Sequence, residues 1–176
     1  MNKKKIDVFD YASDIMKAMQ KGVVVIAKAD GQVNAMTISW GTLGREWEKK
    51  IFTIFIRETR FTHELLVKNP EFTVCIPVDG FDRKIVGICG TKSGRDVDKF
   101  AEAGVSLIDG EMVSVPTIAA TSIVLECKII WKRNQQIEDS DTAFHIYTTD
   151  ANGVYVGPNH DTIYCGEIVN SYLLEN

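Results

Sequence analysis

Basic and hydroxyl side chains gather in one short run of the sequence, R-E-T-R-F-T-H. The run contributes two guanidiniums, two hydroxyls and an imidazole, from Arg57, Thr59, Arg60, Thr62 and His63. Guanidiniums donate charge-assisted hydrogen bonds to phosphate oxygens. The run also lies at the start of a predicted helix over 60–68, where unpaired backbone N–H groups favour an anion. It therefore predicts a phosphate site, although the spacing leaves open a simple helix cap with surface arginines.

A second candidate for anion binding is the turn Ser93-Gly94-Arg95, with Lys99 one helical turn further on. Ser93 and Asp96 are three residues apart, close to a capping box, so we predict a helix over 93–104 that ends at Gly104. A helix start and a lysine suit an anion. A capping role alone is the open alternative.

Upstream of both clusters, residues 32–40 alternate as a β-strand does. Met36, Ile38 and Trp40 point to one face, and Ala35, Thr37 and Ser39 point to the other. The small, polar face leaves room for a flat ligand, and a solvated strand face is the alternative. An apolar cradle followed by hydroxyls and guanidiniums suits a ring system with a phosphate tail.

Other kinds of site find less support in the sequence. It has no G-x-G-x-x-G after a strand, no G-x-x-x-x-G-K and no G-x-S-x-G. His63, His145 and His160 lack metal-ligand spacing, so no metal is expected. The net charge of −4 argues against a general nucleic-acid binder, which would usually be basic.

Length and composition indicate one globular domain spanning 1–176, with 45% apolar and 25% charged residues. No apolar run reaches the length of a membrane span, and Asp7 and Asp10 interrupt the basic start where a signal peptide would be apolar. We therefore expect a cytoplasmic protein that does not bind membranes. The four cysteines are widely spaced and are expected to be core residues in a reducing compartment, with a redox pair or metal site as the alternative.

Six strands are expected to carry these groups, each bounded by turn residues. They cover 23–28, 32–40, 51–57, 71–77, 121–133 and 163–174, with a turn at Asp30-Gly31 and a flexible loop over 41–50. Helices are expected over 10–21, where Asp10 or Ser13 would be the cap, and over 82–89. Many short strands with inserted helices indicate a mainly β barrel. The strands at 51–56 and 123–131 carry more apolar residues than one small barrel can bury, so helices or a second subunit must cover the excess, which supports a homodimer.

The order of these segments resembles the flavin reductase-like, FMN-binding split-barrel family, especially its flavoredoxin-like branch. The resemblance rests on G-V-V-V-I, D-G-Q-V-N-A-M-T-I-S-W, R-E-T-R-F-T-H-E-L-L, N-P-E-F-T-V-C-I-P, C-G-T-K-S-G-R-D-V-D-K-F, L-E-C-K-I and I-Y-C-G-E-I, in that order. It implies a six-stranded Greek-key split barrel and a homodimer with FMN near the subunit interface. The chain departs from the pattern at Asp161, where similar proteins often have a histidine, and over 133–159.

Carried over by position, the resemblance implies a complete set of FMN-binding residues. Asn34, Ala35, Met36, Thr37 and Ser39 would line the edge of the isoalloxazine, and Trp40 would pack near the ring. The phosphate would be bound by Arg57, Thr59, Arg60 and Thr62, with His63 adjacent, and Ser93, Gly94 and Lys99 would close over the ring or the ribityl chain.

The resemblance also implies an NAD(P)H:flavin oxidoreductase that uses NADH or NADPH as electron donor. The flavin would carry the chemistry, so no catalytic side chain is expected. Two alternatives stay open. One is an electron carrier without enzymatic activity that passes electrons to a redox partner protein, and the other is a binding barrel that has lost its flavin.

Overall fold

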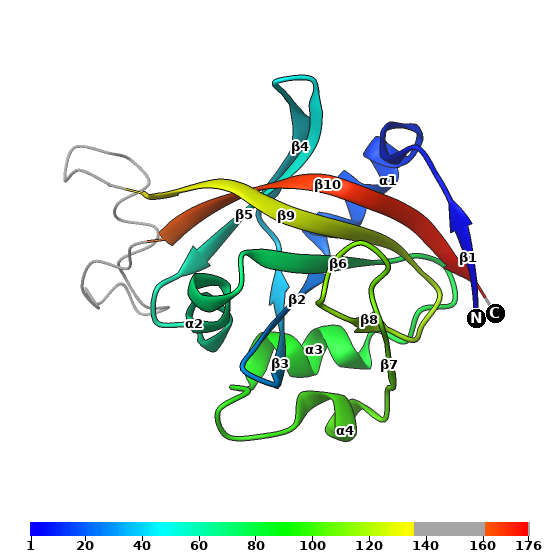
Figure 1. Cartoon of the computed structure of the whole chain (residues 1–176). Helices are drawn as coiled ribbons and strands as arrows, with labels where there is room; N and C mark the ends of the chain where they lie inside the picture. Colours follow the sequence, from blue (N-terminus) through cyan, green and yellow to red (C-terminus); the bar gives the residue numbers. More distant parts are fainter. Residues whose placement is uncertain (136–160, 176) are drawn as a thin grey trace.

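The computed structural model of the chain describes residues 1–135 and 161–175 (Figure 1). Most of the 133–159 stretch, with His145, lies outside the described residues, and so does His160. The described part is built on one antiparallel sheet with the strand order β3-β2-β6-β9-β10-β5-β4, and β1 pairs with β10 beside it. A separate pair, β7 and β8, lies apart from this sheet. The mainly β fold with inserted helices is confirmed.

All six predicted strands form. They are β2 (Val23–Ala29), β3 (Gln32–Ile38), β5 (Lys49–Arg57), β6 (Glu71–Pro77), β9 (Ser122–Asn134) and β10 (Asp161–Glu175). Asp30 and Gly31 join β2 to β3 with φ angles of 51° and 77°, as expected of a tight hairpin turn. The remaining strands are β1 (Asn2–Lys5), β4 (Gly41–Glu46), β7 (Leu107–Ile108) and β8 (Thr117–Ile118).

The prediction of a flexible loop over 41–50 is wrong, because β4 pairs with β5 along its whole length. The turn between them is Trp47-Glu48, with φ angles of 47° and 62°. Both residues take the left-handed conformation that Gly, Asn and Asp usually supply in such hairpins. Since neither residue is of that type, the sequence carried no turn signal.

The helices are η1 (Val8–Tyr11), α1 (Ala12–Gln20), α2 (Phe61–Lys68), α3 (Lys84–Thr91) and α4 (Lys99–Ala103). None of those in the described ranges is long and apolar enough to span a membrane. The caps differ from the prediction, because Asp7 caps η1 and no side chain caps α1.

The helix predicted over 93–104 is mostly wrong. Residues 93–98 form turns, and α4 begins only at Lys99 because Asp98 accepts hydrogen bonds from the backbone N–H groups of Phe100 and Ala101. Asp98 therefore caps the helix, a role expected of Ser93. The predicted end is confirmed, since Gly104 has a φ of 69° and ends α4.

Strand β2 is buried on both faces and separates two parts of the core. Its odd-numbered residues pack with α1 and α2, whereas Val24 and Ile26 pack with Ile85, Val86 and Cys89 of α3. Strand β3 is the end of the sheet's pairing order, so one of its edges has no strand beside it in this sheet. The helices α2 and α3 pack against opposite faces of β2, and both also contact β3 (Figure 1).

All four cysteines are buried and unpaired, which confirms the core interpretation. Burial raises the pKa of Cys75 to about 12 and of Cys89 to about 11. A protonated, buried thiol is a poor nucleophile. We therefore expect an aromatic disulfide reagent to label thiols of the native protein only at the rate of unfolding. In denaturant the same reagent should label all four thiols at once. Rapid labelling of one thiol in the native state would contradict this packing.

Candidate functional site

A cavity of about 240 Å³ lies between β3, the start of α2 and the end of α3 with the loop that follows it. We call it the α2–α3 cavity. Nine predicted site residues line it: Asn34, Met36, Thr37, Thr59, Arg60, Thr62, Ser93, Gly94 and Lys99. The three sequence clusters, far apart in the chain, are thus brought together around one cavity.

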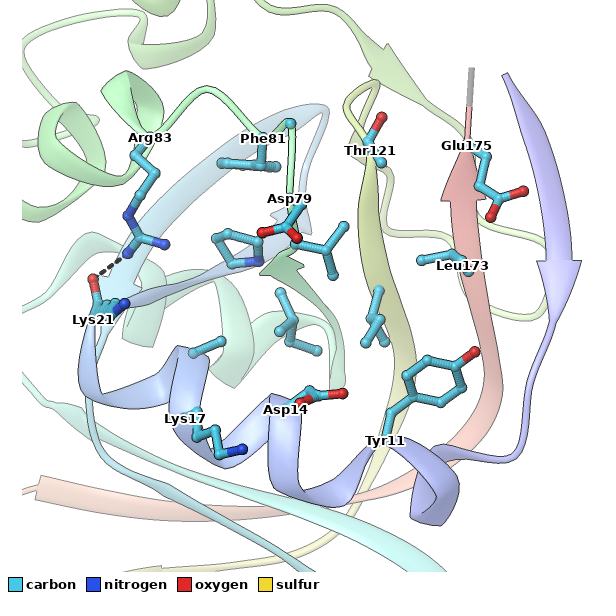
Figure 2. Close-up of a pocket in the computed structure, with 16 residues that line it drawn as sticks. Tyr11, Asp14, Lys17, Lys21, Asp79, Phe81, Arg83, Thr121, Leu173 and Glu175 are labelled. Carbon is cyan, nitrogen blue, oxygen red and sulfur yellow. Dashed lines mark hydrogen bonds between the residues drawn. The ribbon is translucent and has the colours of Figure 1, made fainter.

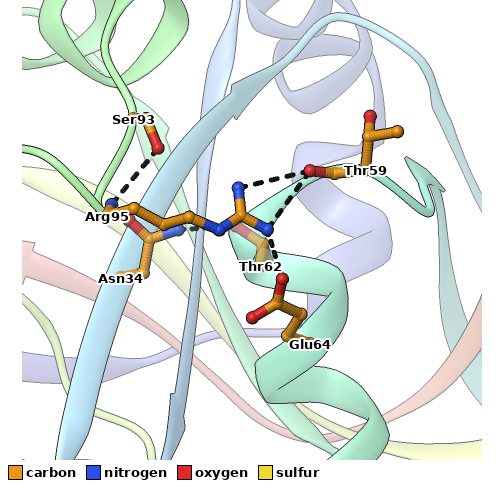
Figure 3. A network of polar contacts seen from close by, with 6 residues as sticks. All are labelled: Asn34, Thr59, Thr62, Glu64, Ser93 and Arg95. Atoms are coloured by element: carbon orange, nitrogen blue, oxygen red, sulfur yellow. Dashed lines mark hydrogen bonds and ion pairs between the residues drawn. The ribbon is translucent and has the colours of Figure 1, made fainter.

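Asn34 and Thr62 connect β3 to the first turn of α2. The Asn34 Nδ2 donates a hydrogen bond to the Thr62 Oγ1 at 2.8 Å, and only 3% and 0% of these two residues is exposed (Figure 3). Gly94 lies directly against this pair, because a Cβ at that position would be 2.0 Å from the Asn34 Oδ1. The loop therefore approaches β3 as closely as only a glycine permits.

Replacing Thr62 with Val is expected to lower the free energy of unfolding by about 1–3 kcal/mol, because it leaves the buried Asn34 amide without its partner. Urea unfolding followed by circular dichroism measures this. Thr42→Val on the exposed strand β4 is the matched control and should change stability little. Equal effects of the two substitutions would show that the Asn34–Thr62 bond is unimportant.

Arg95, which is not among the predicted site residues, also lines the α2–α3 cavity. Its guanidinium donates to the Thr59 carbonyl oxygen at 3.3 Å, forms an ion pair with Glu64 and lies over the Phe61 ring at 5.4 Å (Figure 3). It therefore joins the 93–97 loop to both sides of the α2 start. The Ser93-Gly94-Arg95 turn marked Arg95 as a candidate for anion binding, but no pattern in the sequence predicted its ion pair with Glu64.

Lys99 is a buried cation, with 4% of the residue exposed. Its Nζ donates to the Ala35 carbonyl oxygen at 2.7 Å. Burial, together with the nearby Arg60 charge, lowers the pKa of Lys99, while the Cys89 thiol opposes the shift. No carboxylate of the described residues forms an ion pair with it.

The cations around the α2–α3 cavity fall into two kinds. Lys92 and Arg95 have carboxylate partners, Glu102 and Glu64. In the described ranges, Arg60 and Lys99 have none. Two cations without an ion-pair partner among the described residues therefore line this cavity beside the N-terminus of α2, in a chain whose net charge is −4, although the charges of Arg60 and Asp161 interact. This arrangement favours an anionic ligand.

A second cavity, of about 230 Å³, shares Met36, Thr37 and Arg60 with the first. We call it the Trp40 cavity. Its other lining residues are Ile38, Ser39, Trp40, Phe55, Arg57 and Asp161. Arg57, predicted beside Thr59 and Thr62, lies here instead, because it is the last residue of β5 and pairs across the sheet with Asp161.

Asp161 is nearly buried, and its Oδ1 is 3.9 Å from the Nε of Arg57. Burial raises the pKa of its carboxyl, while the charges of Arg57 and Arg60 oppose the shift. The carboxylate is thus an acceptor placed between an aromatic wall and two guanidiniums.

Two predicted residues line neither cavity. His63 turns away and its Nδ1 is 2.9 Å from the Tyr164 hydroxyl, with burial as the main cause of its lowered pKa. The side chain of Ala35 packs in the core beside α3, and only its carbonyl oxygen is tied to the site, through Lys99.

A larger hollow, of about 740 Å³, lies elsewhere, between α1 and the ends of β6, β9 and β10 (Figure 2). Its rim mixes both charges, and its arginine, Arg83, is already bonded to the carbonyl oxygens of Lys21 and Gly22. None of the predicted site residues lines it. In the part of the chain that the structure describes, no group of three or more metal-ligating side chains comes together either.

Comparison with known proteins shows which family this chain matches. The family model described as "Flavin reductase like domain" matches residues 16–176. Two curated proteins are 28–29% identical over about 110 residues, one from Archaeoglobus fulgidus, covering 61% of this chain and 58% of the relative, and one from Pyrococcus abyssi, covering 65% and 64%. The chain thus matches less than two thirds of the length of either relative.

Solved structures share the fold. A flavoredoxin from Methanosarcina acetivorans is 22% identical with a TM-score of 0.64, and the match covers 88% of this chain and 68% of that one. An FMN-binding domain of a flavin reductases-like enzyme from Shewanella baltica is 16% identical, with a TM-score of 0.66 and coverage of 98% and 78%. The NADH:FAD oxidoreductase SgcE6 from Streptomyces globisporus is 22% identical, with a TM-score of 0.61 and coverage of 86% and 74%.

Proposed function

This chain belongs to the flavin reductase-like domain family, which supports a flavin-related redox function, and we propose that it binds FMN and acts as an NAD(P)H:flavin oxidoreductase. The observation that carries the proposal is the pair of cations at the start of α2, Arg60 and Lys99, which form no ion pair within the described residues. A phosphate monoester is the anion that such a place favours.

The residues present fit the phosphate end of FMN. Thr59 and Ser93 supply hydroxyls at the rim, Arg60 supplies a guanidinium, and the first turn of α2 supplies backbone N–H groups. Each charge-assisted hydrogen bond contributes about 1.5–3 kcal/mol. The Thr62 hydroxyl already accepts a bond from Asn34, so we assign it to holding β3 against α2.

The residues also fit the ring end. The unpartnered edge of β3 passes from the α2–α3 cavity to the Trp40 cavity, which share Met36 and Thr37. Together the two cavities form an elongated site that shares Arg60, with Lys99 at the α2–α3 end and the Trp40 and Phe55 rings at the other. FMN would supply the group that accepts and passes on electrons. Trp40 and Phe55 would orient the ring and exclude water, and Lys99 would hold the anionic end of the molecule in the α2–α3 cavity.

The absorption spectrum of the purified protein, before and after FMN is added and removed by desalting, tests the proposal. Flavin bands retained near one equivalent would support a bound cofactor. FMN-dependent oxidation of NADH or NADPH without retention would identify flavin as a substrate. Neither retention nor turnover would overturn the proposed function.

A carrier that passes electrons to a partner protein is the second candidate, favoured by the likeness to flavoredoxins. Such a protein would retain FMN and be reduced only slowly by NADH or NADPH. Steady-state oxidation of each donor distinguishes the two functions. The four unpaired thiols favour a reducing compartment such as the cytoplasm for either one.

We also propose a homodimer, in which a second copy covers the apolar surface beside the Trp40 cavity. Met16 and Trp40 are 40% and 48% exposed there, and they line a shallow groove with Met19 and Phe55. Exposed apolar patches of this kind are typical of interfaces. Sedimentation should give a dimer for the native protein and a monomer for Met16→Glu, whereas a native monomer at micromolar concentration would contradict this proposal.

A further inference from the structure

The Trp40 cavity contains a carboxylate whose bonding is incomplete. Asp161 is 9% exposed, and within the described residues its buried Oδ1 has no hydrogen-bond partner. The Arg57 Nε, at 3.9 Å, is too far away to supply one. Buried polar atoms in native proteins are nearly always bonded, so an orphaned acceptor at a cavity wall indicates a missing donor.

Arg57 supplies the opposite chemistry beside it. The two residues are direct partners in the β10–β5 register, and both line the cavity. In the described residues, no acceptor takes a hydrogen bond from the Arg57 guanidinium, although that group has five donors. The cavity therefore presents an acceptor and a donor side by side.

The matching ligand edge is a carbonyl next to an N–H, which is the edge of an amide or imide. A ligand carboxylate would bind Arg57 well but would be repelled by Asp161. A simple cation would be attracted by Asp161 but repelled by Arg57. The walls, Trp40, Phe55 and Met36, favour a flat apolar body behind that edge. About 230 Å³ is less than drug-sized ligands need, so the cavity suits one ring or part of a ring system.

We propose that Arg57 and Asp161 together recognise the amide edge of a planar ring, with Asp161 accepting from its N–H and Arg57 donating to its carbonyl. The inference rests on the proposed function, and two sources share this chemistry. One is the imide edge of the FMN ring, and the other is the carboxamide of a nicotinamide substrate.

Two FMN analogues distinguish the first source. FMN methylated at the imide nitrogen lacks that N–H donor and carries a methyl group in its place. If Asp161 holds the imide, the native protein binds the methylated analogue at least about tenfold more weakly, as expected for a bond to a charged group. Asp161→Leu should abolish the difference in affinity between FMN and the methylated analogue. Asp161→Asn, which keeps an acceptor oxygen, should only reduce that difference.

Benzamide and benzoate test the second source. If Asp161 holds a substrate carboxamide, Asp161→Leu weakens benzamide binding to the FMN-loaded protein about tenfold or more and leaves benzoate binding unchanged or tighter. The affinities for FMN and its methylated analogue would then be equal in the native protein. Asp79→Leu, at an exposed site beside the larger hollow, is the control and should change none of these constants.

Either pattern supports amide recognition. If Asp161→Leu alters neither the preference between the two flavins nor the preference for benzamide over benzoate, the proposal is overturned. A native protein that binds no FMN would defeat the proposed function instead, and the benzamide and benzoate titrations, repeated without FMN, would still decide the role of Asp161.

Discussion

A Gly94→Ala variant is expected to bind FMN at least about tenfold more weakly and to lose about 1–3 kcal/mol of stability, the usual cost of overpacking. The new Cβ would lie 2.0 Å from the Asn34 Oδ1 and 3.3 Å from the Phe61 ring. Asn34 cannot rotate away without breaking its bond to Thr62, so the loop itself must move. Ser93 and Arg95 would move with it, which opens the α2–α3 cavity.

The matched control is Gly87→Ala in α3. Nothing lies within 4 Å of a Cβ at that position, and alanine is favoured over glycine within a helix by about 0.5–1 kcal/mol. FMN titration by fluorescence quenching and urea unfolding measure both variants. If Gly94→Ala behaves like Gly87→Ala in both, the close approach of the loop to β3 has no role in the site.

The second large effect is expected for Lys99→Met, which should change binding and stability in opposite directions. Loss of the uncompensated charge should weaken FMN binding roughly 10- to 150-fold, the equivalent of one charge-assisted hydrogen bond of about 1.5–3 kcal/mol.

The stability change follows from the lowered pKa of Lys99. The folded state holds this proton less tightly than the unfolded state, so burial of the charge opposes folding at every pH below the folded-state pKa. This destabilisation decreases as the pH rises from the folded-state pKa of Lys99 towards its unfolded-state pKa. Methionine removes it, so the FMN-free variant should be more stable than the native protein at neutral pH, with a smaller gain at high pH. An unchanged FMN affinity would exclude Lys99 from the site.

The strands, and the cluster of basic and hydroxyl residues at the start of α2, were predictable because they depend on local chemistry. The β2–β3 hairpin follows from Asp30-Gly31, and the position of Thr59 and Arg60 at a helix start follows from the sequence of α2. The prediction that Arg57 lies beside Thr59 and Thr62 was wrong. Strand alternation and the pairing of β5 with β10 turn Arg57 towards Asp161, which is more than 100 residues away in the sequence.

Tertiary contacts also decided the features that the sequence concealed. The β4–β5 hairpin forms although its turn residues, Trp47 and Glu48, are poor formers of that turn, since pairing along β5 overrides local preference. Ser93 looked like a helix cap, yet the loop after it is held by Arg95 contacts to α2, and Asp98 caps the helix instead. Neither the Glu64 partner nor the Asn34–Thr62 bond has a signature in one sequence.

The Arg95 contacts bear on how long a flavin would stay. The ion pair to Glu64 is exposed, at 41% and 50% of the two side chains, so it contributes only about 0–1 kcal/mol and is screened by salt. These contacts nevertheless join the 93–97 loop to Thr59 across the phosphate end of the site. Residence time should therefore shorten as ionic strength rises. Because the ion pair contributes at most about 1 kcal/mol, its loss would shorten the residence time by no more than about fivefold.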